Sequence, residues 1–269
     1  MLQFLQRMNC LTIWHRSSAM TSDNIVSSAI AELQTKGFCV LKRHFAPSLL
    51  KNCREAFWPI LTGYIAEHIE RPNRGPNRHF LAMPFHPPCF APEFFFDARI
   101  LGIARGLMGD NIVADQWGCD APISGAQYQQ PHADYRRPLF PEHPHLDLPF
   151  YMLVVSFGLV DIGLENGPIE IAPGTHRMPR DEAMDAIEMR KIELEPVLLD
   201  IGDVLIRHPW ALHRGSPNRS DQPRPLLTIR YVRDWYADFS RDVRAIPVNI
   251  WTALTPEQQS LLRYPVEAA

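Results

Sequence analysis

The chain has 269 residues, of which 46% are hydrophobic and 21% are charged, a balance typical of a globular protein. Its formal net charge of −3 lacks the basic excess of nucleic-acid-binding proteins, and no apolar run approaches the ~18 residues that span a bilayer. We therefore expect neither a nucleic-acid nor a membrane partner. The five scattered cysteines contain no CxxC pair, which argues against a disulfide framework and favours a cytoplasmic protein with reduced thiols.

Residues 1–22 differ in composition from the rest of the chain. They contain Arg7, Arg16 and several hydroxyl residues but no acidic residue, a composition typical of an organellar presequence. We favour a flexible extension, or a start of translation at Met20, and keep organellar targeting as the alternative. A single domain is then expected over residues 23–269.

The first part of the chain has helical patterning with one short strand. In chain order, the pattern predicts a helix ending at Gly37, a buried strand over 38–41, a helix from Pro47, a loop over 71–92 and a helix over 92–108. A loop of that length in a folded domain is often a lid or a binding loop.

From Asn111 onward, short apolar runs alternate with turn residues, a pattern that indicates strands. We expect a helix over 181–190 and a last helix opening at Thr255. Helices followed by many short strands favour an α+β fold with a β-sandwich or jelly-roll core, flanked by N-terminal and C-terminal helices. The expected strands are 111–117, 126–131, 150–160, 168–171, 196–199, 203–206 and 226–233.

His132 and Asp134 are the sharpest chemical signal. Two residues apart on a strand, they point to the same face, so that an imidazole nitrogen and a carboxylate oxygen converge. With one more histidine they would form the two-His, one-carboxylate facial triad of non-haem Fe(II) oxygenases. The pair alone is weak evidence, because a surface histidine beside a solvated aspartate gives the same letters.

A later segment offers the third ligand and a buried arginine. His213 follows a turn and a buried strand, and His208 is its competitor as a ligand. Arg224 lies 11 residues after His213, directly before the apolar strand 226–233. A lone arginine there is costly to bury unless an anion meets it, and guanidinium binds a carboxylate bidentately. A dicarboxylate co-substrate would supply that anion, and the spacing to Arg224 favours His213 over His208.

Together these motifs resemble the phytanoyl-CoA dioxygenase family of Fe(II)- and 2-oxoglutarate-dependent oxygenases, over about residues 24–235. The matching stretches are His132-Ala133-Asp134, the segment from Glu165 to His176 with its Asn-Gly-Pro and Pro-Gly-Thr-His motifs, and the segment from Gly202 to Arg224. The combination in this order is more specific than any one motif.

The resemblance implies a fold and a set of site residues. The fold would be a double-stranded β-helix, the cupin-like jelly roll. His132, Asp134 and His213 match the catalytic metal ligands, and Arg224 matches the arginine that pairs with the distal carboxylate of 2-oxoglutarate. Ser216, Gln127 and Gln130 are candidates for contacts with the co-substrate, whereas Ser156 stands where some relatives place a tryptophan.

The resemblance also implies the reaction. Fe(II) would be the cofactor, with 2-oxoglutarate and O2 as co-substrates and ascorbate as a reductant. The expected reaction hydroxylates an unactivated C–H bond of a small or medium organic metabolite, with release of succinate and CO2. Halogenating relatives lack the acidic ligand, so the presence of Asp134 favours hydroxylation.

Two other functions fit the same three ligands. Zinc also accepts two histidines and a carboxylate with an open position, so a hydrolase is possible, although a hydrolase has no use for Arg224. A non-catalytic jelly-roll binding or partner protein is the other alternative, although a decayed site usually loses a ligand.

His143 and His145 could form a metal pair, but their proline-rich surroundings favour loop residues, and we interpret His176 as a structural turn residue. Arg136 and Arg137 could clamp an acidic substrate or form a solvated pair. A group of phenylalanines could line a substrate pocket, although core packing is favoured: Phe85, Phe90, Phe94, Phe95 and Phe96.

Overall fold

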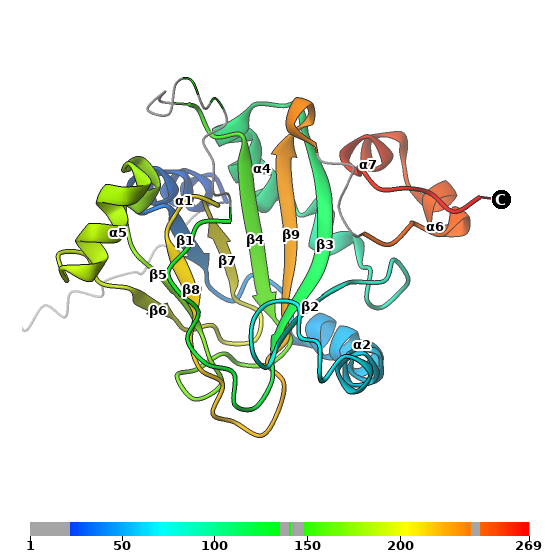
Figure 1. Cartoon of the computed structure of the whole chain (residues 1–269). Helices are drawn as coiled ribbons and strands as arrows, with labels where there is room; N and C mark the ends of the chain where they lie inside the picture. Colours follow the sequence, from blue (N-terminus) through cyan, green and yellow to red (C-terminus); the bar gives the residue numbers. More distant parts are fainter. Residues whose placement is uncertain (1–21, 135–139, 141, 143–147, 238–242, 269) are drawn as a thin grey trace, which may run out of the picture.

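Two antiparallel sheets form the centre of the fold in a computed structural model, which describes residues 22–134, 140, 142, 148–237 and 243–268 (Figure 1). The larger sheet has the strand order β1-β7-β4-β9-β3-β2 and the smaller one β6-β5-β8. The strands are β1 (Phe38–Leu41), β2 (Arg78–Ala82), β3 (Ile112–Pro122), β4 (Met152–Gly158), β5 (Ile169–Ile171), β6 (Glu195–Val197), β7 (Val204–Arg207), β8 (His213–Gly215) and β9 (Leu226–Arg233).

Helices flank the larger sheet. Helices α1, α2 and α4 supply side chains to the same buried core as one face of this sheet, and α7 contacts β3. None of the helices in the described ranges is long and apolar enough to cross a membrane. The helices are α1 (Ser22–Lys36), α2 (Pro47–Glu67), α3 (Pro92–Phe96), α4 (Ala98–Met108), α5 (Arg180–Glu188), α6 (Val248–Ala253) and α7 (Pro256–Leu261).

Strand β9 shows how the sequence separates the two faces of the larger sheet. Successive side chains of a strand point to opposite faces. Leu227, Ile229 and Tyr231 are fully buried in the core shared with the helices. Thr228 and Arg230 alternate with them and line the cavity between the sheets. The alternation therefore gives one apolar face toward the helices and one polar face toward the cavity.

A second, smaller core closes the space between the two sheets. Ile171 of β5 and Val197 of β6 pack in one cluster with Leu205 of β7 and Leu226 of β9. This cluster joins the smaller sheet to the larger one. The two antiparallel sheets and their flanking helices confirm the predicted α+β architecture.

Strand register assembles polar side chains from distant parts of the chain. Val154 of β4 is paired with Arg207 of β7 on one side and with Arg230 of β9 on the other. Arg230 is paired in turn with Gln116 of β3. One row across four strands therefore carries two arginines and a glutamine into the cavity.

Several predicted elements differ from the structure. Strand β2 occupies part of the predicted loop 71–92, where Arg78 to Ala82 pair with β3. The predicted helix 92–108 is broken at Asp97, whose carboxylate caps α4 by accepting hydrogen bonds from the backbone of Arg99 and Ile100. Strands β2 and β8 and helix α6 were not predicted.

The predicted strand 126–131 is wrong, because that segment is irregular in the structure. His132, just after it, forms only an isolated bridge to His213. Of the predicted N-terminal extension, only Ser22 lies in the described ranges, as the first residue of α1.

Candidate active site

His132, Asp134 and His213 come together at one point. One ligand atom from each lies within 4.8 Å of the other two, and in the described part of the chain no other group of His, Cys, Asp or Glu side chains does this. His213 is the first residue of β8, and His132 exchanges two backbone hydrogen bonds of 2.9 Å with it. The backbone N–H of Asp134 donates to the carbonyl of Pro209 at 3.0 Å. The isolated β-bridge between His132 and His213 therefore brings the ligand residues together, a role that we expected of the predicted strand 126–131.

Backbone carbonyls set the tautomer of both histidines. Nδ1 of His132 lies 2.8 Å from the carbonyl oxygen of Gln130, and Nδ1 of His213 lies 2.9 Å from that of Ala211. A carbonyl oxygen only accepts, so each Nδ1 carries the hydrogen and each Nε2 keeps its lone pair. Both imidazoles therefore offer Nε2 as a metal ligand.

Electrostatics favour the ligating protonation state of Asp134 and His213. Burial opposes the charge of Asp134, but the adjacent Arg207 and His213 outweigh this effect and hold the pKa of the carboxyl well below its usual range. Burial, assisted by the charge of Arg207, lowers the pKa of His213 to about 3. At neutral pH the pair is thus a carboxylate and a neutral imidazole, the donor types that Fe(II) takes in a facial triad.

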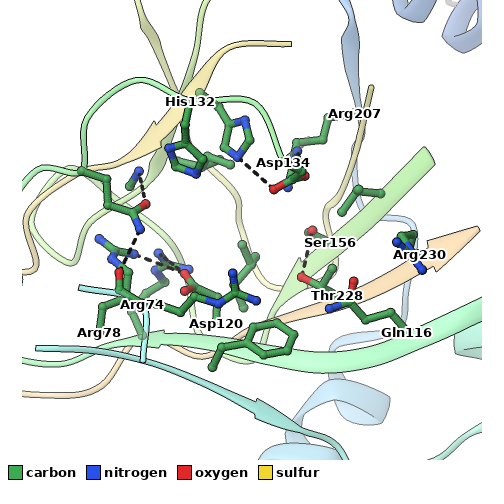
Figure 2. A pocket seen from close by; sticks show the side chains of 18 residues that line it. Arg74, Arg78, Gln116, Asp120, His132, Asp134, Ser156, Arg207, Thr228 and Arg230 are labelled. Atoms are coloured by element: carbon green, nitrogen blue, oxygen red, sulfur yellow. Dashed lines mark hydrogen bonds and ion pairs between the residues drawn. The ribbon is translucent and has the colours of Figure 1, made fainter. Parts of the chain in front are cut away.

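A cavity of ≈ 170 Å³ lies between the two sheets and includes the three ligand residues in its lining (Figure 2). Apolar side chains such as Phe80, Val154 and Leu226 form part of its wall. The charged and polar residues of the lining are Arg74, Arg78, Gln116, Asp120, Gln129, Ser156, Arg207, Arg224, Thr228 and Arg230, in addition to His132, Asp134 and His213.

Arg224 lines this cavity and is only 1% exposed. Its Nη2 lies 3.4 Å from a carboxylate oxygen of Asp120, which also accepts from Nη1 of Arg78 at 3.2 Å. Nε and Nη1 of Arg224 have no hydrogen-bond partner within the described residues. Burial lowers the pKa of Arg224 to about 10, so it is still charged at neutral pH. Arg78 and Arg224 are both buried and share the one carboxylate of Asp120. The site therefore keeps a positive charge that can bind an anion.

Comparison with known proteins identifies the family. The model of the phytanoyl-CoA dioxygenase family (PhyH) matches residues 33–226, a range that contains the three metal-ligand candidates and Arg224. The chain belongs to the phytanoyl-CoA dioxygenase family. The family consists of non-haem iron oxygenases that use Fe(II) and 2-oxoglutarate and act on small molecules.

One curated relative of this PhyH-family chain matches part of its length. The dioxygenase lolE1 of Epichloe uncinata is 30% identical over 132 residues, which are 43% of this chain and 52% of that protein. The match thus covers about half of the length of this curated relative.

Solved structures share the fold. AviO1 of Streptomyces viridochromogenes Tue57 is 20% identical, with a TM-score of 0.59 over 82% of this chain and 99% of that one. The non-haem α-ketoglutarate-dependent carbocyclase SnoK from nogalamycin biosynthesis is 18% identical, with a TM-score of 0.59 over 79% and 86%. These similarities confirm the predicted double-stranded β-helix fold.

Three other predicted contact residues lie outside the lining of the cavity. The hydroxyl of Ser216 donates to the carbonyl of Pro168 at 2.6 Å, and the exposed amide of Gln127 donates to the carbonyl of Gly125. Gln130 contributes a backbone carbonyl to His132. The structure brings none of these three side chains to the cavity. Their roles toward a co-substrate stay predictions.

Gln129, which was not predicted, does line the cavity. Its amide oxygen accepts from the backbone N–H of Gly215, and its amide nitrogen donates to the carbonyl of Arg74. Ser156 also lines the cavity, where its hydroxyl lies 3.2 Å from that of Thr228.

His208 and His176 lie outside the metal-ligand group, which agrees with the preference for His213. Nδ1 of His208 accepts from the backbone N–H of Trp210, so this nitrogen is already occupied. The phenylalanines were expected in the core, and Phe85, Phe90, Phe94 and Phe95 are buried there with Phe96 packed against them. His143, His145, Arg136 and Arg137 lie outside the described residues.

His208 provides a test by pH. Burial, assisted by the charges of His176 and Arg207, lowers its pKa from 6.5 to about 3. Between these two pH values, His208 binds a proton in the unfolded chain but not in the folded chain. The free energy of unfolding therefore falls as the pH falls. His208→Gln, which keeps an acceptor for Trp210, should reduce this slope by up to about 1.4 kcal/mol per pH unit. Urea unfolding of the metal-free protein between pH 4 and pH 6 measures it, and an unchanged slope would contradict the prediction.

The sequence missed Arg207, Arg78 and Asp120. Arg207 ends the buried apolar strand β7, and Arg78 lies on β2 at an edge of the larger sheet. A charged residue at the end of an apolar strand is the signal that singled out Arg224, and the same argument could have found Arg207. Arg78 had no such signal, because the segment around it, rich in Pro, Asn, His and Phe, predicts a loop.

Proposed function

We propose that the protein is an Fe(II)- and 2-oxoglutarate-dependent dioxygenase that hydroxylates an unactivated C–H bond of a small or medium organic metabolite. Succinate and CO2 are the other products, and ascorbate would keep the metal reduced. Arg224 carries the proposal: a buried arginine with two unpartnered donors lines the same cavity as a two-His, one-carboxylate triad. A dicarboxylate that reaches from the metal to Arg224 would satisfy both ends.

The roles of the chain follow from the geometry. Nε2 of His132, Nε2 of His213 and a carboxylate oxygen of Asp134 would hold the metal on one side and leave its other positions to ligands in the cavity. Arg224 would bind and orient the distal carboxylate of the co-substrate. Asp120, which accepts hydrogen bonds from both Arg224 and Arg78, would hold the Arg224 side chain in place. When bound, iron supplies the oxidising chemistry with O2, and the protein supplies orientation and exclusion of water.

The two alternatives have less support. A zinc hydrolase at the same ligands would leave Arg224 with only the carboxylate of Asp120, which it shares with Arg78. A non-catalytic binding protein would have no need of three intact ligands whose donor atoms converge at one point. Among the described cysteines, Cys39, Cys53, Cys89 and Cys119 are free and buried, which supports a reducing, cytoplasmic location.

An anaerobic titration tests the proposal. Fe(II) is added to the metal-free protein, followed by 2-oxoglutarate, and the visible metal-to-ligand charge-transfer band of the chelate is recorded. We expect the band with 2-oxoglutarate but not with succinate, which lacks the keto group needed for chelation. Fe(II) binding without the band, or binding of Zn(II) alone, would reject the oxygenase and favour one of the alternatives.

A further inference from the structure

We propose that Arg207 is a positioning residue for Asp134: it occupies one carboxylate oxygen, so that the aspartate offers only the other oxygen to the metal. The inference rests on the proposed metal site and assigns a role to a residue outside the three ligands.

The two oxygens of Asp134 have different partners. Oδ2 accepts a hydrogen bond from Nη1 of Arg207 at 2.7 Å, whereas Oδ1 is the oxygen 3.6 Å from Nε2 of His213. Figure 2 shows Arg207 beside Asp134 at the edge of the cavity. Oδ1 therefore faces the metal position, and Oδ2 is turned toward the arginine.

Arg207 is the more firmly held of the two residues. It lies on an interior strand of the larger sheet, where its backbone pairs with Phe38 of β1 and Val154 of β4. Its side chain is only 9% exposed, against 31% for Asp134. Asp134 lies outside any strand or helix, and its backbone is held by a hydrogen bond from its N–H to the carbonyl of Pro209. The arginine thus serves as the fixed point from which the aspartate is oriented.

This arrangement has a chemical consequence. An aspartate can bind a metal through one oxygen or through both, and the second mode would use a coordination position that the co-substrate or O2 needs. A charge-assisted hydrogen bond to Oδ2 competes with the second mode. It also orders the carboxylate before the metal arrives, which reduces the entropic cost of binding. Partners of metal ligands commonly contribute 10–100-fold to metal affinity.

The experiment uses Co(II) as the probe, because its affinity and its visible spectrum report the ligand set without turnover. We expect Arg207→Met to raise the Kd for Co(II) by about 10–100-fold and to change the visible spectrum of the bound ion. Arg207→Lys, which retains a cationic donor, should recover part of the affinity. Arg214→Met is the matched control, since Arg214 of β8 forms a 2.7 Å ion pair with Glu170 of β5 but does not line the cavity.

Combination with Asp134→Ala separates positioning from a general loss of structure. Without the carboxylate, Arg207→Met should change the Kd less than twofold. An equal loss in both backgrounds, an equal loss in Arg214→Met, or an unchanged Kd and spectrum in Arg207→Met would overturn the proposal. Thermal unfolding of every variant shows whether it is folded.

The result is independent of the co-substrate. If the wild type binds Co(II) as described but its Fe(II) form shows no band with 2-oxoglutarate, the proposed function fails and the role of Arg207 stands. If the band appears and Arg207→Met binds Co(II) like the wild type, only the role of Arg207 fails.

Discussion

His213→Ala is expected to reduce conversion of 2-oxoglutarate to succinate by more than about 100-fold, because loss of a direct ligand should exceed the 10–100-fold effects seen for partners of ligands. His132→Ala should have a similar effect. Both Nε2 atoms are held toward the metal position by backbone carbonyls, and no other described histidine belongs to the group. Succinate release in the absence of added substrate, together with Fe(II) affinity by calorimetry, measures the loss.

His208→Gln is the control for this pair. His208 lies five residues before His213 and is the other histidine that the spacing permits as a ligand, yet it stands outside the metal-ligand group. The His208→Gln variant should retain Fe(II) affinity and succinate release within about twofold, as expected for loss of a neutral group that contacts neither metal nor co-substrate. Full activity in His213→Ala with loss in His208→Gln would assign the third ligand the other way.

The sequence predicted those parts of the site whose chemistry is local. His132 and Asp134 are two residues apart, and Arg224 stands before an apolar strand where a charge demands an anion. Both signals follow from short-range geometry and from the cost of burying charge. The assignment of His213 depended on its spacing from Arg224, so it too could be made without knowing the strand register.

The missing parts depend on which strands become neighbours. Arg207 meets Asp134 only when β7 and the segment after residue 131 lie across one cavity, a contact between residues 73 positions apart. Arg78 and Arg224 share Asp120 because β2 and the start of β9 both adjoin β3. Local patterning contains no information about such pairs.

The failed strand 126–131 has a related cause. Its alternation fits a strand, but its polar groups are satisfied elsewhere: Gln129 bonds to Gly215 and Arg74, and the Gln130 carbonyl serves His132. Strand β8 was missed because its residues, His213, Arg214 and Gly215, include no apolar or β-branched side chain that would signal a strand. In both places the site geometry overrides the local propensity, as expected near functional residues.

Arg224→Met is expected to raise the Kd for 2-oxoglutarate by about 100-fold, while the Kd for Fe(II) stays within about twofold. Truncating one partner of a buried, hydrogen-bonded charge pair costs about 2–5 kcal/mol, and 100-fold corresponds to about 2.7 kcal/mol. Arg224 has two unpartnered donors for the carboxylate, and it does not contact the metal-ligand group. The intensity of the charge-transfer band during an anaerobic titration gives the co-substrate affinity, and calorimetry gives the metal affinity.

Two further variants make this result specific. Arg224→Lys keeps the charge but loses the bidentate geometry, so its Kd for 2-oxoglutarate should lie between those of the wild type and Arg224→Met. Arg214→Met removes a neighbouring arginine that pairs with Glu170 outside the cavity, and it should bind 2-oxoglutarate like the wild type. Equal weakening in Arg214→Met and Arg224→Met would indicate a general electrostatic effect. An unchanged Kd in Arg224→Met would mean that the buried positive charge serves another anion, and the dicarboxylate assignment would fall while the metal site stayed intact.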